Sequence, residues 1–414
     1  MPRGCAAVTA TQERVMPAST EALSEIVARC DRSGQKIHIV GGDTLAGMGF
    51  PPEACDLTLL TTELTGIVAN ERADLTLAVR SGTPLQDVAT LLAAQEQFLP
   101  FDAPKPHYAT VGGTLAAGWL GPRRHLHGRI RDYVIGSTIV LADGTVARAG
   151  GMVVKNVAGY DMSRLYVGSF GTLGVLVQTN FKTAPLPPHS RLFFAPLPEH
   201  TRGRTCAQLT SLAIRPAAAF WIEGFHKSVD GDDGPEGRIV VLLEGSEALL
   251  ERATRDVRSA LGRAGVPETR VVDAGAREAF ERVLDAYVAC LGERSITYRI
   301  YPFPEQSEHC VVRLRDVAAG CALRTETIVD VMNGDVVLRV SDLNMRALGS
   351  KVEIFDDALH ELEPRAQVVA GRHPHRIYLR VWGEAPAAIE QMRALKARFD
   401  PHRTLNPGRF VGGI

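Results

Sequence analysis

The chain has 414 residues, of which 45% are hydrophobic and 22% charged, and its formal net charge is −1. This composition is typical of a globular protein with two or three domains, and it provides no overall attraction to nucleic acid or to an anionic membrane. No apolar run approaches the roughly 18 residues of a membrane span, and the start of the chain lacks the apolar core of a signal peptide. The seven cysteines are scattered without a Cys-x-x-Cys pair, which argues against an iron–sulfur or zinc site and favours a reduced, cytoplasmic setting.

The first predicted elements are a helix, a strand and a glycine-rich loop. Apolar residues recur on one face of residues 19–32, where Ser19 can cap the helix and Gly34 can end it. The strand at 36–40 runs directly into the loop at 41–49. No helix is signalled after this loop, so it differs from the Gly-x-Gly-x-x-Gly turn of a Rossmann dinucleotide site.

Several strands and one helix are expected in the rest of the N-terminal half. A capping box at Thr83, with Pro84 at the first helical position, predicts a helix start. The proline-rich stretch 98–106 should be extended, and Asp143-Gly144 predicts a hairpin turn. A domain boundary is expected at 185–188. The strands are expected at 56–60, 66–70, 75–80, 134–141, 145–149 and 175–183.

The pattern changes after the boundary to strand, helix, strand, strand, helix, which is typical of a ferredoxin-like half. These elements are expected at 191–195, 202–213, 218–225, 238–244 and 246–261. Further strands, with weakly signalled helices between them, are expected at 295–301, 310–314, 335–340 and 376–381. No internal repeat is evident. A last helix at 386–399 is predicted to bury Ile389, Met392, Leu395 and Phe399.

Three glycine-containing segments, 110–114, 155–161 and 168–175, lie close together in the chain. Paired glycines beside β-branched residues indicate backbone that runs close to another group without side chains intervening. Main-chain N–H groups in such loops can hold an anion. Tight turns explain any one segment alone, but three of them, with 41–49 upstream, favour a binding site.

With these residues in view, the N-terminal half resembles the FAD-binding domain of the vanillyl-alcohol-oxidase (PCMH) type. Residues 40–44 are similar to that family's first pyrophosphate loop, 110–113 to its second, 168–175 to its closing strand motif, and Asn406-Pro407-Gly408 to its C-terminal signature. Within the family, the runs at 121–124 and 154–161 most resemble the FAD-binding E subunits of glycolate oxidases. The middle of the chain matches only in outline.

The resemblance implies an α+β fold with a two-subdomain PCMH-type FAD-binding domain at 1–188. It further implies a ferredoxin-like α+β cap at 189–384, and a C-terminal helix and tail at 385–414 that return to the FAD domain. The cofactor would be non-covalent FAD, because Asp43 stands near the place where some relatives carry a histidine that bonds to the flavin. The residues expected to bind FAD are Val40, Gly41, Gly42, Asp43, Thr44, Thr110, Val111, Gly112, Gly113, Leu115, Arg123, Val157, Gly171, Thr172, Leu173, Gly174, Val175 and Asn406.

The physical argument for this site is that glycines at 41, 42, 112 and 113 let the oxygens of a pyrophosphate approach two loops on neighbouring strands. Main-chain N–H groups of both loops would then bind the anion without an arginine. Apolar side chains, among them Leu115 and Leu173, would line the ring and the adenine.

No catalytic base is predicted. The related D-type subunits carry a His-x-Gly-Asp-Gly-Asn-x-His run, and the nearest string here, 333–336, has no flanking histidine. Phe170 also replaces the glutamate of the usual Gly-Ser-Glu-Gly. Tyr298 and Arg299 are expected either to meet a substrate carboxylate or to form an ordinary strand pair with an outward arginine.

The remaining histidines give no metal site. His373 and His375 are separated by Pro374 and are expected in a solvated basic loop. His125 and His127 could face the flavin phosphates or a partner subunit, or lie in a solvated loop. His309 is a further candidate base.

The resemblance therefore implies an FAD-binding subunit of a glycolate oxidase complex that oxidises 2-hydroxy acids. Its partners would be a D-type flavoprotein subunit and an F-type iron–sulfur subunit, and its location cytoplasmic, with association to the inner membrane left open. Two alternatives stand beside this hypothesis: a self-sufficient FAD-dependent D-2-hydroxy-acid dehydrogenase, and a non-catalytic scaffold subunit.

Overall fold

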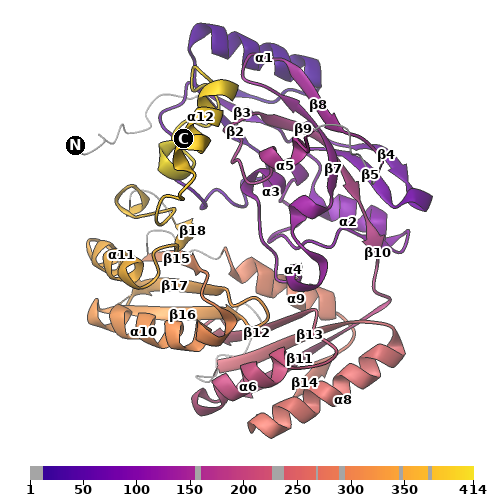
Figure 1. Cartoon of the computed structure of the whole chain (residues 1–414), viewed down its shortest axis with the longest axis vertical. Coiled ribbons are helices and arrows are strands. Elements are labelled where there is room, and N and C mark those ends of the chain that lie inside the picture. Colours follow the sequence, from indigo (N-terminus) through magenta and orange to yellow (C-terminus); the bar gives the residue numbers. More distant parts are fainter. Residues whose placement is uncertain are drawn as a thin grey trace.

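A computed structural model shows two parts stacked on each other, with a mixed sheet-and-helix architecture in both (Figure 1). Of the described helices, none is long and apolar enough to cross a membrane. The structure describes residues 13–153, 160–225, 237–266, 269–288, 294–344, 348–371 and 375–414.

A small parallel sheet, in the order β1-β3-β2, lies at one end of the N-terminal part. Helix α1 (Thr20–Ser33) follows the prediction: the Ser19 hydroxyl accepts a hydrogen bond from Ala22 N, and Gly34 ends the helix at φ +71°. Its apolar face packs on the strands, where Leu23, Val27 and Cys30 are fully buried. The strands are β1 (Glu13–Val15), β2 (Ile37–Val40) and β3 (Leu57–Leu60).

A five-stranded antiparallel sheet, in the order β4-β5-β9-β7-β8, forms the second subdomain. Helices α2 (Leu85–Ala93) and α3 (Val111–Ala117) pack on it. The predicted capping box is wrong: the Thr83 hydroxyl accepts a hydrogen bond from Gly66 N instead, 2.9 Å away, and Pro84 is the N-cap. The strands are β4 (Ile67–Glu71), β5 (Thr76–Arg80), β7 (Val134–Val140), β8 (Val146–Gly150) and β9 (Val175–Lys182).

Short elements connect these layers. Helix α4 follows the Gly-Pro-Arg-Arg run, and β6 and β10 pair where the chain leaves the N-terminal part. The short elements are β6 (Gln97–Phe98), α4 (Arg124–His127), α5 (Ser163–Tyr166) and β10 (Ala184–Pro185).

The cap is one antiparallel sheet in the order β14-β11-β13-β12-β16-β17-β15-β18. It contains two strand–helix–strand–strand–helix–strand units, each with the strand order of a ferredoxin-like fold, paired edge to edge through β12 and β16. The sequence shows no internal repeat, so the repetition of these two units is visible only in the structure. The first unit is β11 (His189–Leu197), α6 (Arg202–Thr210), β12 (Ala218–Glu223), β13 (Gly237–Gly245), α8 (Glu247–Ala264) and β14 (Arg270–Val272). The second is β15 (Ser295–Ile300), α10 (Ser307–Gly320), β16 (Leu323–Asp330), β17 (Val336–Asp342), α11 (Lys351–Leu362) and β18 (Gln367–Gly371).

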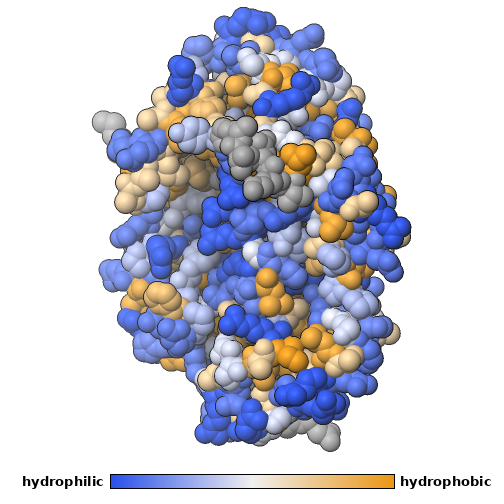
Figure 2. All heavy atoms as spheres, turned by 45° about the vertical axis from the view of Figure 1, so that its right-hand side comes forward, coloured by the Kyte–Doolittle hydropathy of each residue, from blue (hydrophilic) through white to orange (hydrophobic). Residues whose placement is uncertain are grey.

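The two faces of the cap sheet have different neighbours (Figure 1). Helices α6, α8, α10 and α11 cover one face through a large apolar core. Helix α9 (Ala276–Ala286), which joins the two units, covers the other face and packs with Trp119 and Phe170 of the N-terminal part. On the face shown in Figure 2, hydrophilic side chains predominate and the hydrophobic ones form small separate groups.

Two predicted strands of the cap are wrong. Residues 310–314 lie inside helix α10, because Cys310, Leu314 and Ala318 repeat at a four-residue spacing and form its buried stripe. Residues 376–381 form no strand; the chain there makes a short 3-10 helix at His375–Tyr378. The strands β16 and β18 were not predicted.

The C-terminal helix α12 (Ile389–Phe399) lies against the N-terminal part. The prediction of its buried face is wrong, because Leu395 is 39% exposed and Lys396 is the residue of this helix that is buried. After α12 the chain runs beside β2: Leu405 pairs with Ile37 in parallel, Ile37 N donates to Thr404 O at 2.7 Å, and Asn406 N donates to Ile37 O at 2.9 Å.

Candidate functional site

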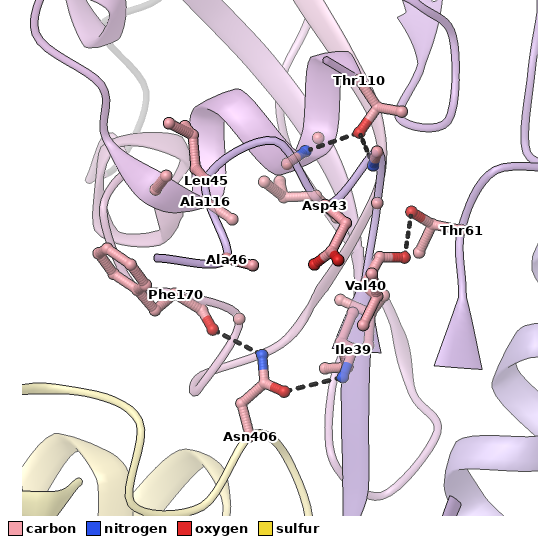
Figure 3. A pocket seen from close by; sticks show the side chains of 18 of the residues that line it. Ile39, Val40, Asp43, Leu45, Ala46, Thr61, Thr110, Ala116, Phe170 and Asn406 are labelled. Carbon is pink, nitrogen blue, oxygen red and sulfur yellow. Dashed lines mark hydrogen bonds between the residues drawn. The ribbon is translucent and has the colours of Figure 1, made fainter. Parts of the chain in front are cut away.

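A pocket opens where β2, the start of α3, the loop before β9 and the C-terminal segment meet (Figure 3). It holds about 810 Å³ of empty space, counting its open mouth, which is within the range of cofactor sites. Its lining comes from 38–46, Thr61, the first turns of α3, 169–171, 174–176 and two C-terminal residues, Asn406 and Arg409. The expected lining residues found there are Val40, Gly41, Gly42, Asp43, Thr44, Thr110, Gly112, Gly113, Gly171, Gly174, Val175 and Asn406.

The paired glycines allow the loops to pack against each other. A Cβ on Gly42 would lie 1.6 Å from the carbonyl oxygen of Tyr108, and one on Gly112 would lie 2.6 Å from the Cβ of Ser81. The expectation was that these glycines leave room for cofactor oxygens. The structure shows another reason for glycine at these positions: neighbouring protein atoms already occupy the space that a side chain would need.

The Thr110 hydroxyl joins the two glycine loops. It caps α3 by accepting a hydrogen bond from Gly113 N at 3.3 Å, and it accepts another from Gly42 N at 3.4 Å (Figure 3). This places the first loop against the start of α3, a helix that the sequence reading did not anticipate.

Only one of the two loops offers unused main-chain donors. At the start of α3, Val111 N donates to Thr83 O and Gly112 N donates to Ser81 O. Within the part of the chain that the structure describes, the N–H groups of Asp43, Thr44 and Leu45 have no hydrogen-bond partner. The expectation that both loops direct N–H groups at an anion is therefore corrected to the first loop.

Asn406 fixes the C-terminal segment to both of the other motifs. Its Oδ1 accepts a hydrogen bond from Ile39 N at 2.8 Å, and its Nδ2 donates to Phe170 O at 2.7 Å (Figure 3). Asn406 is 2% exposed and has φ +42°, a conformation that asparagine tolerates better than most residues. The C-terminal signature thus acts as part of the site's frame.

A buried lysine supports the same junction. Lys396 Nζ donates to Thr172 O at 2.7 Å and to Leu405 O at 3.0 Å, and forms an ion pair with Asp400. Asp400 in turn accepts hydrogen bonds from Thr404 N and Leu405 N. Burial lowers the pKa of Lys396, and Asp400 opposes that shift.

Phe170, which stands in the place of a glutamate, has left-handed backbone (φ +55°) and a buried ring at the pocket. The ring lies edge-on to Trp382 at 4.9 Å and stacks on Phe410 at 5.8 Å, centroid to centroid. This end of the pocket is therefore apolar, with Leu45 and Ala116 nearby (Figure 3).

The ionisable side chains that line the pocket are His38, Asp43 and Arg409, and sequence reasoning missed the first and the last. Burial, with the nearby charge of Arg409, lowers the pKa of His38 to about 4, so the ring is neutral at pH 7. Desolvation raises the pKa of Asp43, while Arg409 and Arg14 oppose that shift. A sequence signal for Arg409 existed, since it follows the C-terminal signature directly, but nothing in the chain pointed to His38.

Other expected cofactor residues lie elsewhere. Four of them are buried next to the pocket without lining it: Val111, Leu115, Thr172 and Leu173. Val157 lies outside the described residues.

Arg123, also expected to bind the cofactor, lies away from the pocket lining. Its guanidinium pairs with Asp102 at 2.6 Å and with Glu244 of the cap at 2.9 Å. Arg123 thus joins the two parts of the molecule.

The neighbouring residues of the Gly-Pro-Arg-Arg run also bind the cap. Arg124 pairs with Asp335 at 2.6 Å, and Pro122 O accepts a hydrogen bond from Asn333 Nδ2 at 2.8 Å. Arg299 is 2% exposed and also pairs with Asp335, so neither expectation for it, a substrate contact or an outward strand position, fits the structure. The Tyr298 hydroxyl donates to Asp356.

The histidine candidates supply no base at the pocket. His125 Nε2 lies 2.8 Å from Pro216 O of the cap, and the His127 ring packs edge-on against Phe98. His309 is exposed on α10, while His373 and the side chain of His375 lie outside the described residues. Among the residues that the structure describes, no group of three or more His, Cys, Asp or Glu side chains is arranged to hold a metal.

Comparison with known proteins connects this geometry to a cofactor. Residues 12–161 match the FAD binding domain family, and residues 377–410 match the C-terminal domain of FAD linked oxidases. The N-terminal part therefore has the fold of a PCMH-type FAD-binding domain. The unused N–H groups of the first loop and the apolar end at Phe170 suit the anionic and aromatic parts of FAD, which supplies hydride and electron transfer when bound.

The relatives are oxidoreductases. The chain is 40% identical to the glycolate oxidase subunit GlcE of Escherichia coli over 171 residues, which is 41% of this chain and about half (48%) of that subunit. It is 28% identical to the glycolate oxidase subunit GlcD of Bacillus subtilis over 96% of this chain and 88% of that protein. A D-lactate dehydrogenase of Anaerostipes hadrus is 23% identical over 95% and 88%.

Solved structures show the same fold over nearly the whole chain. p-Cresol methylhydroxylase with bound substrate superposes with a TM-score of 0.70 at 16% identity, covering 96% of this chain and 88% of that one. Alkyldihydroxyacetonephosphate synthase gives 0.68 at 15% identity, covering 95% and 75%. The α+β fold with a PCMH-type FAD domain is thereby confirmed.

Proposed function

We propose that the chain is the FAD-binding subunit of a glycolate-oxidase-type complex that oxidises 2-hydroxy acids such as glycolate or D-lactate. The observation that supports this most is the pocket itself, which has a loop frame for FAD and whose described lining carries His38, Asp43 and Arg409 as its ionisable side chains. His38 lies on β2, Asp43 on the first loop and Arg409 in the C-terminal segment, and burial with the charge of Arg409 keeps His38 neutral at pH 7. A base for a 2-hydroxy acid would then come from another subunit.

In this proposal the chain's residues bind and orient the cofactor. The N–H groups of the first loop bind the cofactor's anionic part, Thr110 and Asn406 hold the loops in place, and Phe170 with Trp382 excludes water from the apolar end. The FAD is held without a covalent bond, because the carboxylate of Asp43 cannot form the histidyl link of some relatives. The partners are a D-type flavoprotein subunit, where most of the hydride transfer takes place, and an iron–sulfur subunit. A cytoplasmic location stays a prediction.

The test is anaerobic mixing of the purified chain with glycolate or D-lactate, with and without a D-type subunit, followed by absorbance near 450 nm. We expect a flavin spectrum, release of all the flavin on acid precipitation, and bleaching at useful rates only when the D-type subunit is present. Full-rate bleaching by the chain alone would overturn the division of labour. Yellow colour retained by the precipitate would overturn the non-covalent bond.

A second candidate is a self-sufficient D-2-hydroxy-acid dehydrogenase. The observation that favours it is the near full-length similarity to GlcD of Bacillus subtilis and to a D-lactate dehydrogenase. The same experiment separates the two, because this candidate predicts bleaching by the chain alone. A third, a scaffold subunit without bound flavin, predicts no absorbance near 450 nm.

A further inference from the structure

One charged side chain at the pocket has no counter-charge in contact with it among the residues that the structure describes. Arg409 lines the pocket and is only partly exposed. Within the described residues its guanidinium makes no hydrogen bond and no ion pair, and its one ring contact is with Phe170, 5.9 Å away. Burial lowers the pKa of Arg409, and the carboxylate of Asp43 opposes that shift without contacting it. A partly buried cation without a partner is costly, so its retention needs a reason.

The main chain at Arg409 is firmly placed. Arg409 O accepts hydrogen bonds from Phe50 N at 3.0 Å and from Trp382 Nε1 at 3.2 Å, and Arg409 N donates to Asn406 O at 3.3 Å. These three bonds position the side chain without using its own donors. The five N–H groups of the guanidinium therefore stay available to a ligand.

The surroundings of Arg409 favour an anion at this end of the pocket. The N–H groups of Asp43, Thr44 and Leu45 are unused within the described residues, and they belong to the same lining. His38 is neutral at pH 7, so among the described residues of the lining Arg409 carries the positive charge. The ring of Phe170 lies beside the guanidinium, with its centroid 5.9 Å from Arg409 Cζ, and offers no counter-charge. FAD has one strongly anionic group, its diphosphate, and a guanidinium matches phosphate oxygens in a bidentate manner.

We propose that Arg409 is the counter-ion of the FAD diphosphate and binds it together with the N–H groups of the first loop. The inference rests on the proposed FAD-binding function and adds to it the residue that selects for the phosphates. It also reverses the expectation that no arginine is needed at this site. The carboxylate of Asp43 on the same loop opposes the diphosphate, and the charge of Arg409 compensates for it.

The test uses the full-length apoprotein and three probes: FAD, ADP and riboflavin. Arg409→Gln removes the charge, and Arg409→Lys keeps the charge but lacks the planar guanidinium that can bind two phosphate oxygens at once. Arg398→Gln is the matched control, because it removes one charge from an exposed residue of the same C-terminal region. Dissociation constants are measured by titration calorimetry or flavin fluorescence at low and high salt. Thermal unfolding of each apoprotein checks that the variants are folded.

For Arg409→Gln we expect the dissociation constants of FAD and ADP to rise roughly tenfold or more, with a weaker dependence on salt. Riboflavin, which has no phosphate, should bind as tightly as to the unchanged protein. Arg409→Lys should recover part of the ADP affinity, and Arg398→Gln should behave like the unchanged protein.

Unchanged ADP binding in Arg409→Gln would overturn the inference. So would an equal loss of riboflavin and ADP binding, or a shift in the reduction potential of bound FAD with unchanged affinity, because either result would place Arg409 at the ring. These outcomes can be distinguished from a failure of the proposed function. If the unchanged protein binds FAD and ADP but supports no 2-hydroxy-acid oxidation with its partner, only the proposed function is contradicted.

Discussion

At the scale of single residues, the pocket depends on glycines that have no Cβ atom. The carbonyl oxygen of Tyr108 lies where a Cβ of Gly42 would be, 1.6 Å from it, and backbone cannot move aside as a flexible side chain can. The same close approach lets the Thr110 hydroxyl reach Gly42 N. A side chain at 42 would therefore separate the first loop from α3.

Replacing Gly42 by alanine should thus lower both stability and cofactor binding. We expect a loss of about 1–3 kcal/mol in the free energy of unfolding, which is the usual cost of overpacking, together with FAD lost on gel filtration. Urea unfolding and the ratio of 450 nm to 280 nm absorbance measure the two effects. Gly151→Ala is the control, because a Cβ there meets no atom within 4 Å; equal behaviour of the two variants would contradict the packing argument.

The residue scale also shows where sequence reasoning stops. The glycine loops and Asn406 were found because each motif is local in the chain. His38 and Arg409 were missed, since they meet only when the segment after α12 pairs with β2. The resemblance predicts Arg123 at the cofactor, because Arg123 belongs to the family-specific run at 121–124. In the structure its charge is neutralised by Asp102 and Glu244.

At the scale of elements, α12 works through one buried charge. Most of this helix is exposed, and its link to the site is Lys396, which reaches Thr172 O in the loop before β9 and Leu405 O after the helix. A helix with apolar residues at the expected spacing can therefore be attached to its neighbours through a buried polar side chain and not through those apolar residues. The amphipathic pattern alone does not reveal this.

Lys396→Met should leave Asp400 buried without its ion-pair partner. Because breaking a buried pair costs about 3–5 kcal/mol, we expect a large loss of stability and of FAD retention. In Lys396→Met/Asp400→Asn the uncompensated charge is gone, while the amide oxygen can still accept from Thr404 N or Leu405 N, so part of the loss should be recovered. Urea unfolding of both variants checks this, and a double variant no more stable than the single one would refute the buried-charge explanation.

Element predictions succeeded where the signal was short-range. Helix α1 has both caps in the sequence, and the β7–β8 hairpin has its Asp-Gly turn. Helix α10 was misread because Cys310-Val311-Val312 looks like a strand over three residues, and only the longer spacing to Ala318 reveals the helix. Strand β16 was missed since Arg324 and Glu326 interrupt its apolar pattern, and their charges are met by neighbouring side chains.

At the scale of the whole molecule, charged side chains join the FAD domain to the cap. Arg123 and Arg124 come from one short run, and their partners Glu244, Asp330 and Asp335 lie on the cap sheet or at the ends of its strands. This run resembles the E subunits, and its role here is interdomain contact. The two-unit cap could not be foreseen, because its units share a topology without a visible sequence repeat.

One member of this junction should make stability depend on pH. Burial, followed by the charge of Asp335, raises the pKa of Asp330 to about 7, against the opposing effects of Arg124 and Asn333. Between about pH 4 and 7 the folded protein holds a proton on this carboxyl that the unfolded chain releases. The contribution of Asp330 to stability is therefore fully present below the carboxyl's ordinary pKa and is lost as the pH rises through 7.

Asp330→Asn should remove this dependence. Relative to the unchanged protein, we expect the variant to gain stability between pH 5 and pH 7.5, measured as the free energy of urea unfolding at both values. Asp357→Asn, at an exposed carboxylate on α11, is the control and should show no such gain. Parallel pH profiles for Asp330→Asn and the unchanged protein would contradict the assignment.

The pairing of Leu405 with Ile37 has a consequence for biosynthesis. A ribosome completes the N-terminal part, residues 1–188, while more than 200 residues are still to be added, and domains commonly fold in that order as they emerge. Here the C-terminal segment of the lining, with Asn406 and Arg409, is translated after the rest of the lining and after the whole cap. Cofactor loading should therefore follow synthesis of the cap, so that FAD binding reports on a chain that has been made at least as far as Arg409.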